Sequence, residues 1–402
     1  MYGPHELGMS AGQLRSGDWL SPARLRMIGI LLTLAYGATW VFLLSGHGPF
    51  DPLGRPVGSD FAAFYGVSRA LWQGVPATSL YDPEAFNAAV RPFTGAMQYV
   101  WVYPPTAFLA YWPLGLLPYF TSLAVWIGGG LATYLVVAWS ILPNRTALLG
   151  AALSPAVFIA MIHGHNGLLL ATLIGGGLVL LPTAPFTAGL LLGCAVVKPH
   201  LALLVPVALL ADRRWRAVAG VVVMAVALSA IATAAFGSDS WVRFAQSGTL
   251  MRSMLEMEAV SYTKISSVFA AARLLGASLV IAYLAQGIAT SGAVWLVYVA
   301  WRRALPYDLK AALLIFAGLL ATPYVYDYDL PVSVIGLAFW AREALRTGWR
   351  PWEKSMLFAA WVMPLSMRAI AMTTHIGLLP ATLVVSIALV LTRREPIEGD
   401  AA

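Results

Sequence analysis

A single carboxylate, Asp60, stands just beyond the first long hydrophobic stretch, in the segment "GSDFAAFYGVSRAL". An acid at the start of a predicted helix can cap that helix with one oxygen. It can also take a proton from a hydroxyl group as a general base. A capping acid keeps its second oxygen free, so the sequence leaves both uses open.

Further polar side chains recur near the ends of apolar stretches, where a charge is costly unless it is paired or hydrated. We expect these side chains to face one cavity that opens on one side of a membrane. They are His163, His165 and Asn166 in "HGHNG", Lys198 and His200 in "KPH", and Tyr326, Asp327, Tyr328 and Asp329 in "PYVYDYD".

Each of these groups also has a purely structural interpretation. The histidines of "HGHNG" can be interfacial residues, and two histidines two positions apart without a nearby third ligand are a weak sign of a metal site. Lys198 lies in the middle of an apolar run, so it either pairs with an aspartate or holds an anionic phosphate. The acids of "DYD" can belong to an interface girdle that faces water.

The composition limits the fold class. The chain of 402 residues is 59% hydrophobic and 11% charged, which is too few charges to cover the surface of a soluble protein. The sequence therefore predicts an all-α polytopic membrane protein. The net charge of +7 does not indicate nucleic-acid binding, because Arg and Lys lie mostly in short links between apolar segments, where they set topology.

The apolar stretches predict about twelve transmembrane or half-membrane helices. A pair of short helices is expected over 187–211, meeting at "KPH". The other predicted spans are 24–45, 121–142, 147–163, 167–182, 217–236, 277–300, 309–323, 330–341, 355–371 and 376–392.

These spans predict one transmembrane domain over 23–395, with cytoplasmic tails at 1–22 and 396–402. Two external loops are expected, at 46–120 and 237–275. The first loop should carry juxtamembrane helices, one of them beginning at Pro83 with Asp82 as its N-cap. Four prolines within 103–119 predict an interfacial or re-entrant segment at its end.

The ordered motifs "GSDF", "YPP", "HGHNG", "AGLLLGCAVVKPHLALL" and "ATPYVYDYDL" resemble those of glycosyltransferase family 87, a branch of the GT-C superfamily of membrane glycosyltransferases. The resemblance extends from about Ile30 to Ala341. It implies a polytopic GT-C fold, a sugar donor carried on a polyprenyl phosphate and an acceptor glycosylated on the outer face. Asp60 matches the essential acid that the superfamily places in its first external loop.

The better-known actinobacterial members of this family are mannosyltransferases, so the resemblance favours mannose or another hexose as the sugar. The sequence departs from those members at two motifs. "TPYVYDYD" has no histidine where they carry histidines, and "HGHN" stands where many relatives have Gly-Gln-Asn. The acceptor is a glycolipid, a polysaccharide or another hydroxyl-bearing molecule.

Such a transfer assigns a role to each candidate. Asp60 is the expected base, and transfer by direct displacement with inversion needs no second acid. Lys198, His200 and Tyr103 are expected to bind the donor phosphate. The expected sugar or acceptor ligands are His163, His165, Asn166, Tyr326, Asp327 and Asp329.

No metal or other cofactor is expected, because the sequence has no phosphate-binding glycine loop after a strand and no soluble domain with paired acids. The expected location is the bacterial plasma membrane, with both termini cytoplasmic and the site facing the periplasm. Two alternatives stay open: a transporter or flippase of lipid-linked sugars without group transfer, and a structural membrane subunit.

Overall fold

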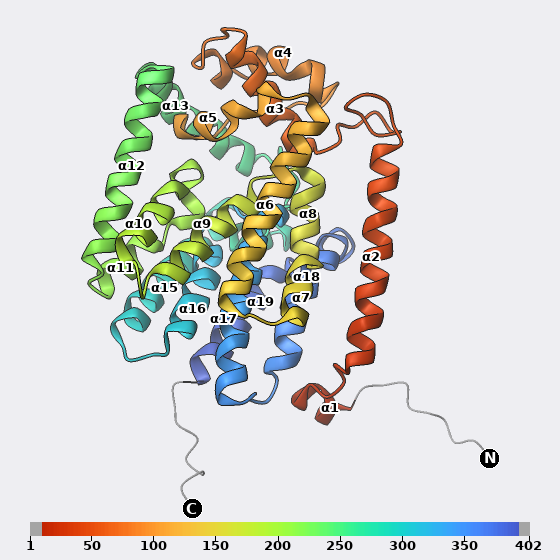
Figure 1. The fold of residues 1–402 in the computed structure, drawn as a ribbon, viewed down its shortest axis with the longest axis vertical. Helices are drawn as coiled ribbons and strands as arrows, with labels where there is room; N and C mark the ends of the chain where they lie inside the picture. Colours follow the sequence, from red (N-terminus) through yellow and green to blue (C-terminus); the bar gives the residue numbers. More distant parts are fainter. Residues whose placement is uncertain (1–9, 394–402) are drawn as a thin grey trace, which may run out of the picture.

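The computed structural model describes residues 10–393, and in this range the chain is a succession of helices joined by turns and loops (Figure 1). The α-helices are α1 (Ala11–Ser16), α2 (Pro22–Leu44), α3 (Ser59–Trp72), α4 (Pro83–Thr94), α5 (Pro105–Tyr111), α6 (Tyr119–Ile141), α7 (Arg145–Ala152), α8 (Pro155–His163), α9 (Gly167–Leu180), α10 (Pro185–Gly193), α11 (Val205–Ala211), α12 (Trp215–Phe236), α13 (Asp239–Glu256), α14 (Val268–Leu274), α15 (Leu279–Arg302), α16 (Tyr307–Ala321), α17 (Pro331–Thr347), α18 (Glu353–Thr374) and α19 (Leu378–Thr392). Short 3₁₀ turns are η1 (Ser79–Tyr81), η2 (Trp112–Leu116), η3 (Cys194–Val197), η4 (Pro199–Ala202) and η5 (Asp327–Asp329).

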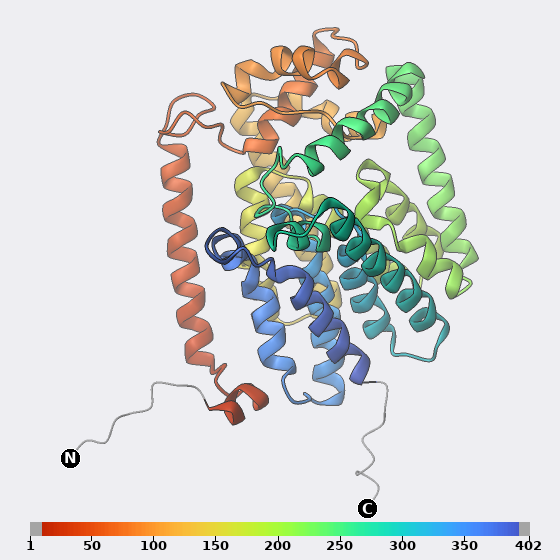
Figure 2. The ribbon, with the colours of Figure 1, turned by 180° about the vertical axis from the view of Figure 1, so that it is seen from behind.

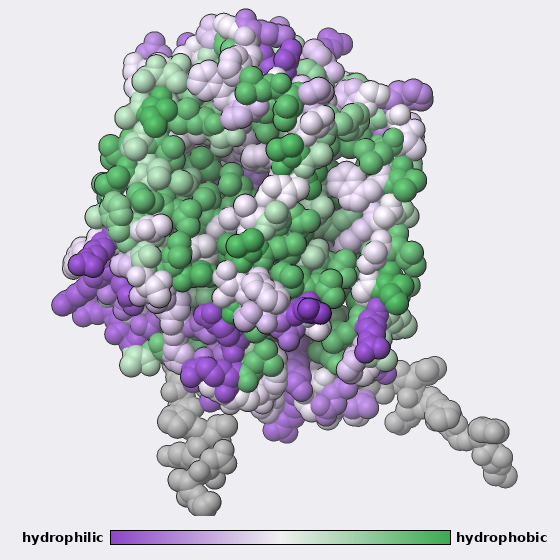
Figure 3. All heavy atoms as spheres, viewed as in Figure 1, coloured by the Kyte–Doolittle hydropathy of each residue, from purple (hydrophilic) through white to green (hydrophobic). Residues whose placement is uncertain are grey.

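The helices identify an all-α polytopic membrane protein. Five of the described helices, α2, α6, α12, α15 and α18, are long and apolar enough to cross a membrane, and α7 with α8 adds a sixth if this pair, bent by 43°, counts as one span. Figure 3 shows an apolar band around the middle of the visible face, with hydrophilic residues gathered mainly at the two ends. The fold class predicted from the sequence is confirmed.

Most of the predicted spans coincide with a helix, but several are too short to cross a bilayer alone. The helices α9, α11 and α19 have at most 15 residues, against the ~20 that a straight span needs. The predicted break at "KPH" is present, because η3 ends at Val197 and η4 begins at Pro199. Lys198 therefore lies between two short helical pieces, where its backbone leaves the helical conformation.

One predicted boundary is wrong. The expected span 330–341 ends too early, because α17 continues to Thr347. Arg342 does not stop the helix, since its Nε donates to Asp308 Oδ2 at 2.7 Å and its Nη1 donates to the carbonyl oxygen of Ile141 at 3.1 Å. A charged side chain with tertiary partners can continue a helix that composition alone would end.

The segment between α2 and α6 forms a cap over one end of the bundle, which we call the α3–α5 end (Figures 1 and 2). Asp82 accepts a hydrogen bond from the backbone N–H of Ala85 at 2.9 Å, as expected for the N-cap of α4. The proline-rich segment 103–119 forms α5 and η2 within this cap. The cap places the N-terminus of α3 against the helices below it.

The opposite end of the bundle carries α1 and the C-terminal end of α19 (Figures 1 and 2). Within the predicted tail 1–22, α1 is helical and Trp19 Nε1 donates to Ser355 Oγ at 2.7 Å, so this part of the tail packs against α18. The predicted tail 396–402 and residues 1–9 lie outside the described residues. The tail and domain boundaries themselves stay predictions.

Candidate active site

Asp60 does not act as the N-cap of α3. Asp60 is the second residue of α3, and within residues 10–393 the N-terminus of this helix receives no side-chain capping hydrogen bond. The N-cap interpretation is therefore wrong. Asp60 Oδ2 instead lies 3.7 Å from Nδ1 of His163, and the Asp60 side chain is 23% exposed. The acid is accessible to a substrate while its environment is mostly protein.

His163 is the last residue of α8, and its ring is hydrogen-bonded to Ser59, the residue before Asp60. Ser59 Oγ and His163 Nδ1 share a hydrogen bond of 2.6 Å. Gly164 follows in the left-handed conformation, with φ of 57°. A Cβ at Gly164 would lie 2.5 Å from Cβ of Phe61 on α3. Glycine thus lets α3 approach the "HGHNG" turn closely enough to place Asp60 beside His163.

A second, buried group of side chains lies close by. Lys198 Nζ donates to Asp329 Oδ1 at 2.5 Å and lies 3.4 Å from His165 Nε2. The same His165 nitrogen is 3.2 Å from the hydroxyl of Tyr103. Lys198, Asp329 and His165 are buried. The ion pair that sequence reasoning gave as the structural alternative for Lys198 is present, and direct phosphate binding by Lys198 stays a prediction.

The two acids of the late motif "PYVYDYD" lie in the protein interior. Asp327 and Asp329 are both buried, so the interpretation of "DYD" as a girdle with acids facing water is wrong. Asp329 Oδ2 accepts from the backbone N–H of Tyr326 at 3.2 Å. The ring of Tyr328 stacks on His165 with 3.8 Å between centroids, and it also stacks on Tyr326 with 5.2 Å between centroids. A Cβ at Gly167 would lie 2.1 Å from the carbonyl oxygen of Tyr328, so only glycine permits this close approach.

Two of the predicted residues lie at the edge of the buried group. The side-chain N–H of Asn166 donates to the hydroxyl of Tyr111 at 2.7 Å, and its Oδ1 is buried without a partner among the described residues. His200 lies against the ring of Tyr324, and its buried Nε2 likewise has no partner there. Among residues 10–393, neither side chain forms a hydrogen bond or an ion pair with Asp60.

The predicted residues therefore form two layers, and they do not all line one open cavity. Asp60 and His163 make a partly exposed layer, and the Lys198 group makes a buried one. The physical reason is that opposite charges away from water are most stable when they pair with each other. The sequence contains both the cation Lys198 and the acid Asp329, and the fold brings them together.

Burial raises the pKa of Asp60, the partly exposed acid. It raises the pKa of the Asp60 carboxyl to about 7, while the ammonium groups of Lys264 and Lys198 oppose the shift. A carboxyl with a pKa near neutrality is suited to accept a proton from a hydroxyl at physiological pH. A fully hydrated aspartate is a weaker base than this one.

Sequence reasoning missed two cations of the site, Lys264 and Arg368. Burial raises the pKa of Asp327, and the charges of Arg368 and Lys264 oppose the shift, so both lie near this acid. Arg368 Nη1 is 4.0 Å from Asp327 Oδ2. A signal existed in each case: Arg368 stands inside a predicted span, and Lys264 is the only lysine of the second external loop.

The segment predicted as the second external loop, 237–275, is hydrogen-bonded to the late motif "PYVYDYD". The backbone N–H of Ser266 donates to the carbonyl oxygen of Val325 at 2.7 Å, and Ile265 and Tyr326 form an isolated antiparallel bridge. These bonds hold Lys264 over the acids of "DYD". Within residues 10–393, no three His, Cys, Asp or Glu side chains are grouped to hold a metal ion. The arrangement offers a base, several cations and hydrogen-bonding groups for an anionic substrate.

A sequence model of glycosyltransferase family 87 matches residues 101–323, which is more than half of the chain. The matched range contains the "YPP", "HGHNG" and "KPH" motifs. It begins after Asp60 and ends before "YVYDYD", so the match itself does not assign a role to either. No curated protein and no solved structure matches the chain.

Proposed function

The chain belongs to glycosyltransferase family 87, and from this premise we propose that it moves a sugar from a polyprenyl-phosphate carrier to an acceptor hydroxyl at the outer face of the bacterial plasma membrane. The observation that carries the proposal is the partly exposed Asp60 carboxylate, beside cations and at one end of a membrane-spanning bundle. A base next to positive charge is the arrangement that transfer from a sugar phosphate requires.

The reaction can be written with its charges balanced. The acceptor oxygen forms a bond to the anomeric carbon and loses its proton to Asp60. The bond from the anomeric carbon to the phosphate oxygen breaks, and its electron pair stays on that oxygen. The polyprenyl phosphodiester, with one negative charge, leaves as a monoester with two. A single displacement of this kind inverts the configuration at the anomeric carbon.

The residues around Asp60 have distinct proposed roles. His163 is placed to hydrogen-bond the sugar or the acceptor beside the base, because it lies 3.7 Å from the Asp60 carboxylate. Lys198 adds positive charge beneath the donor phosphate while Asp329 holds it. His165 and Tyr103 extend that network toward the substrate. His200, Asn166, Tyr326 and Asp327 complete the proposed set of donor and sugar contacts.

The distribution of arginines and lysines supports the proposed orientation. The links α11–α12, α15–α16 and α17–α18, which carry several Arg and Lys residues, lie toward the end opposite α3–α5 (Figures 1 and 3). Short links rich in these residues stay in the cytoplasm. This supports an orientation with α1 in the cytoplasm and Asp60 toward the periplasm. We propose mannose as the sugar, and a glycolipid or polysaccharide as the acceptor.

Transfer by the purified protein tests the proposal. Detergent-solubilised protein is incubated with radiolabelled polyprenyl-phosphate mannose and a glycolipid extract, and labelled product and free polyprenyl phosphate are measured together. Asp60→Asn should lower turnover by about 100-fold or more, the scale of losing a general base. The matched control is Asp82→Asn in the same loop, because asparagine also caps helices and should leave turnover unchanged.

The result also separates the alternatives. A flippase would move the lipid-linked sugar without releasing free polyprenyl phosphate, and a structural subunit would show neither activity. Equal turnover in Asp60→Asn and in wild type would remove Asp60 from the mechanism.

A further inference from the structure

The proposed reaction doubles the negative charge on the leaving phosphate, so cations must be able to reach it. Lys198 is poorly placed for direct contact, because it is 4% exposed and is hydrogen-bonded to Asp329. Its charge is already largely balanced by that acid. The cation that touches the phosphate should therefore be a different one, with an accessible side chain.

Lys264 meets this requirement. Its side chain is half-buried, and among residues 10–393 its ammonium group forms no hydrogen bond and no ion pair within 4 Å, although its charge acts on Asp60 and Asp327. The flanking backbone is nevertheless fixed, since Ser266 bonds to Val325 and Ile265 bridges to Tyr326. A free ammonium on an anchored loop is prepared for an anionic ligand without the cost of ordering the loop.

Arg368 lies near Asp327, an acid on which the charge of Lys264 also acts. It projects from α18, its side chain is 43% exposed, and its nearest carboxylate, Asp327 Oδ2, is at 4.0 Å. This distance is longer than a charge-assisted hydrogen bond of ~2.8 Å. The guanidinium therefore keeps hydrogen-bond donors available, and Arg can grip a phosphate with two parallel N–H bonds.

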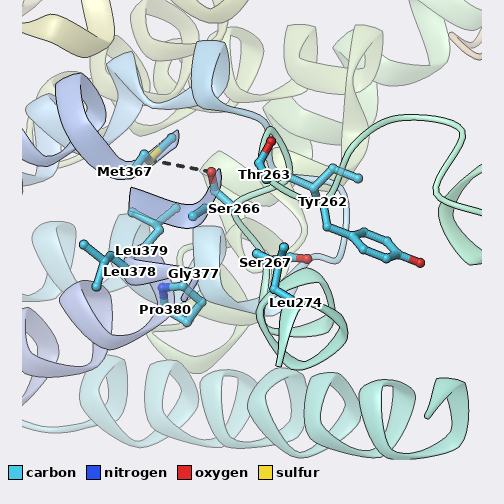
Figure 4. Close-up of a pocket in the computed structure, with 12 residues that line it drawn as sticks. Tyr262, Thr263, Ser266, Ser267, Leu274, Met367, Gly377, Leu378, Leu379 and Pro380 are labelled. Carbon is cyan, nitrogen blue, oxygen red and sulfur yellow. Dashed lines mark hydrogen bonds between the residues drawn. The ribbon is translucent and has the colours of Figure 1, made fainter. Parts of the chain in front are cut away.

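A small cavity lies near the two cations in sequence, between the segment 237–275, α18 and the start of α19 (Figure 4). Its volume of about 10 Å³ has room for about one water molecule, and neither cation lines it. Its lining includes Thr263 and Ile265, the two neighbours of Lys264, and Met367, the neighbour of Arg368. In Figure 4, Ser266 faces Met367 while Leu378, Leu379 and Pro380 line another part of the wall.

We propose that Lys264 and Arg368 bind the phosphate of a lipid-linked donor. This inference rests on the proposed donor class. Charge complementarity selects the occupant, because two cations that act on the same acid, Asp327, fit an anionic head group.

The position of the two cations also fits the direction of the reaction. Lys264 is the foremost positive charge acting on Asp60, and it also acts on Asp327. A phosphate bound there has its sugar within the region of the base. Because the phosphate gains charge as the bond breaks, the two cations stabilise the transition state more than the bound donor. Loss of either cation should therefore lower kcat as well as weaken binding.

Binding of farnesyl phosphate to the full-length protein in detergent tests the inference without any turnover. Farnesol, which has the same tail without the phosphate, is the matched probe. Lys264→Gln and Arg368→Gln should each weaken farnesyl phosphate about 10- to 100-fold and leave farnesol binding unchanged. Arg243→Gln, which removes an exposed charge from the same external loop, is the control and should bind as wild type does.

Lys264→Arg, which keeps the charge, should retain most of the affinity, and equal melting temperatures show that each variant is folded. If Lys264→Gln or Arg368→Gln does not fold, binding of farnesyl phosphate to wild type and to Lys264→Arg is titrated with salt instead. Affinity for the phosphate should fall as ionic strength rises.

The outcomes separate this inference from the proposed function. If Lys264→Gln and Arg368→Gln bind farnesyl phosphate as tightly as wild type, or wild type does not bind it, the phosphate site is overturned even where wild type transfers sugar. If both variants lose farnesyl phosphate selectively but wild type releases no polyprenyl phosphate from any lipid-linked sugar, the site stands and the proposed function fails.

Discussion

The dependence of turnover on pH gives a sharp test of Asp60 as the base. Asp60 must be ionised to accept a proton, and burial raises its pKa to about 7. With that pKa, about one tenth of the protein carries the carboxylate at pH 6 and about nine tenths carries it at pH 8. The value of kcat/KM should therefore rise about tenfold between these pH values.

An ordinary aspartate would behave differently. With a pKa of about 3.9 it would be ionised throughout this range, and the profile would be flat. The assay is transfer from labelled polyprenyl-phosphate mannose at a donor concentration far below KM, because kcat/KM reports the free enzyme. A flat profile from pH 6 to pH 8 would refute the claim that burial tunes this acid.

Two variants assign the inflection to a residue. His163 lies 3.7 Å from Asp60, so His163→Gln should keep the inflection if the acid is its source. Lys264→Gln should move it to higher pH, because the ammonium group favours the ionised carboxylate. Arg243→Gln, in the same loop, should leave it in place. An inflection that disappears with His163 would transfer the assignment to the histidine.

Four further outcomes are expected. First, the pKa of Asp60 is higher in the folded protein than its ordinary value of 3.8, so its ionisation lowers the stability of the folded state increasingly from pH 4 to about 7. Asp60→Asn should therefore have a higher melting temperature than wild type at pH 8, and the difference should vanish toward pH 4. Second, Lys198→Met should destabilise the protein by about 3–5 kcal/mol in denaturant unfolding, and adding Asp329→Leu should restore part of the loss; strict additivity would contradict the buried ion pair. Third, Gly164→Ala should lose at least about 1–2 kcal/mol of stability and most transfer, because φ is positive and the new Cβ meets α3, whereas Gly129→Ala has open space around it and should behave as wild type. Fourth, EDTA should leave transfer unchanged, and restoration of activity by Mg²⁺ or Mn²⁺ after chelation would contradict metal independence.

The membrane class and most helices could be predicted from the sequence, because each depends on local composition. An apolar run makes a helix that avoids water, and proline or a capping acid marks its ends. The break at Lys198 and the N-cap Asp82 follow from such local rules. The same rules misplaced the end of α17, because the partner of Arg342 is Asp308, which is far away in the sequence.

The candidate site was predictable as a set of residues but not as an arrangement. A charge placed in an apolar setting is costly wherever the chain folds, so Asp60, Lys198 and the "DYD" acids stood out from the sequence alone. Whether Lys198 meets a phosphate or Asp329 depends on which segments come together, and these two residues are 131 positions apart.

The sequence thus determined which side chains need partners, because the cost of removing a charge from water depends on its immediate surroundings. Only the tertiary structure decided which partners they have. It paired Lys198 with Asp329, left Asp60 partly exposed and placed Lys264 over the site, because electrostatic pairing depends on distances between segments that no local pattern contains.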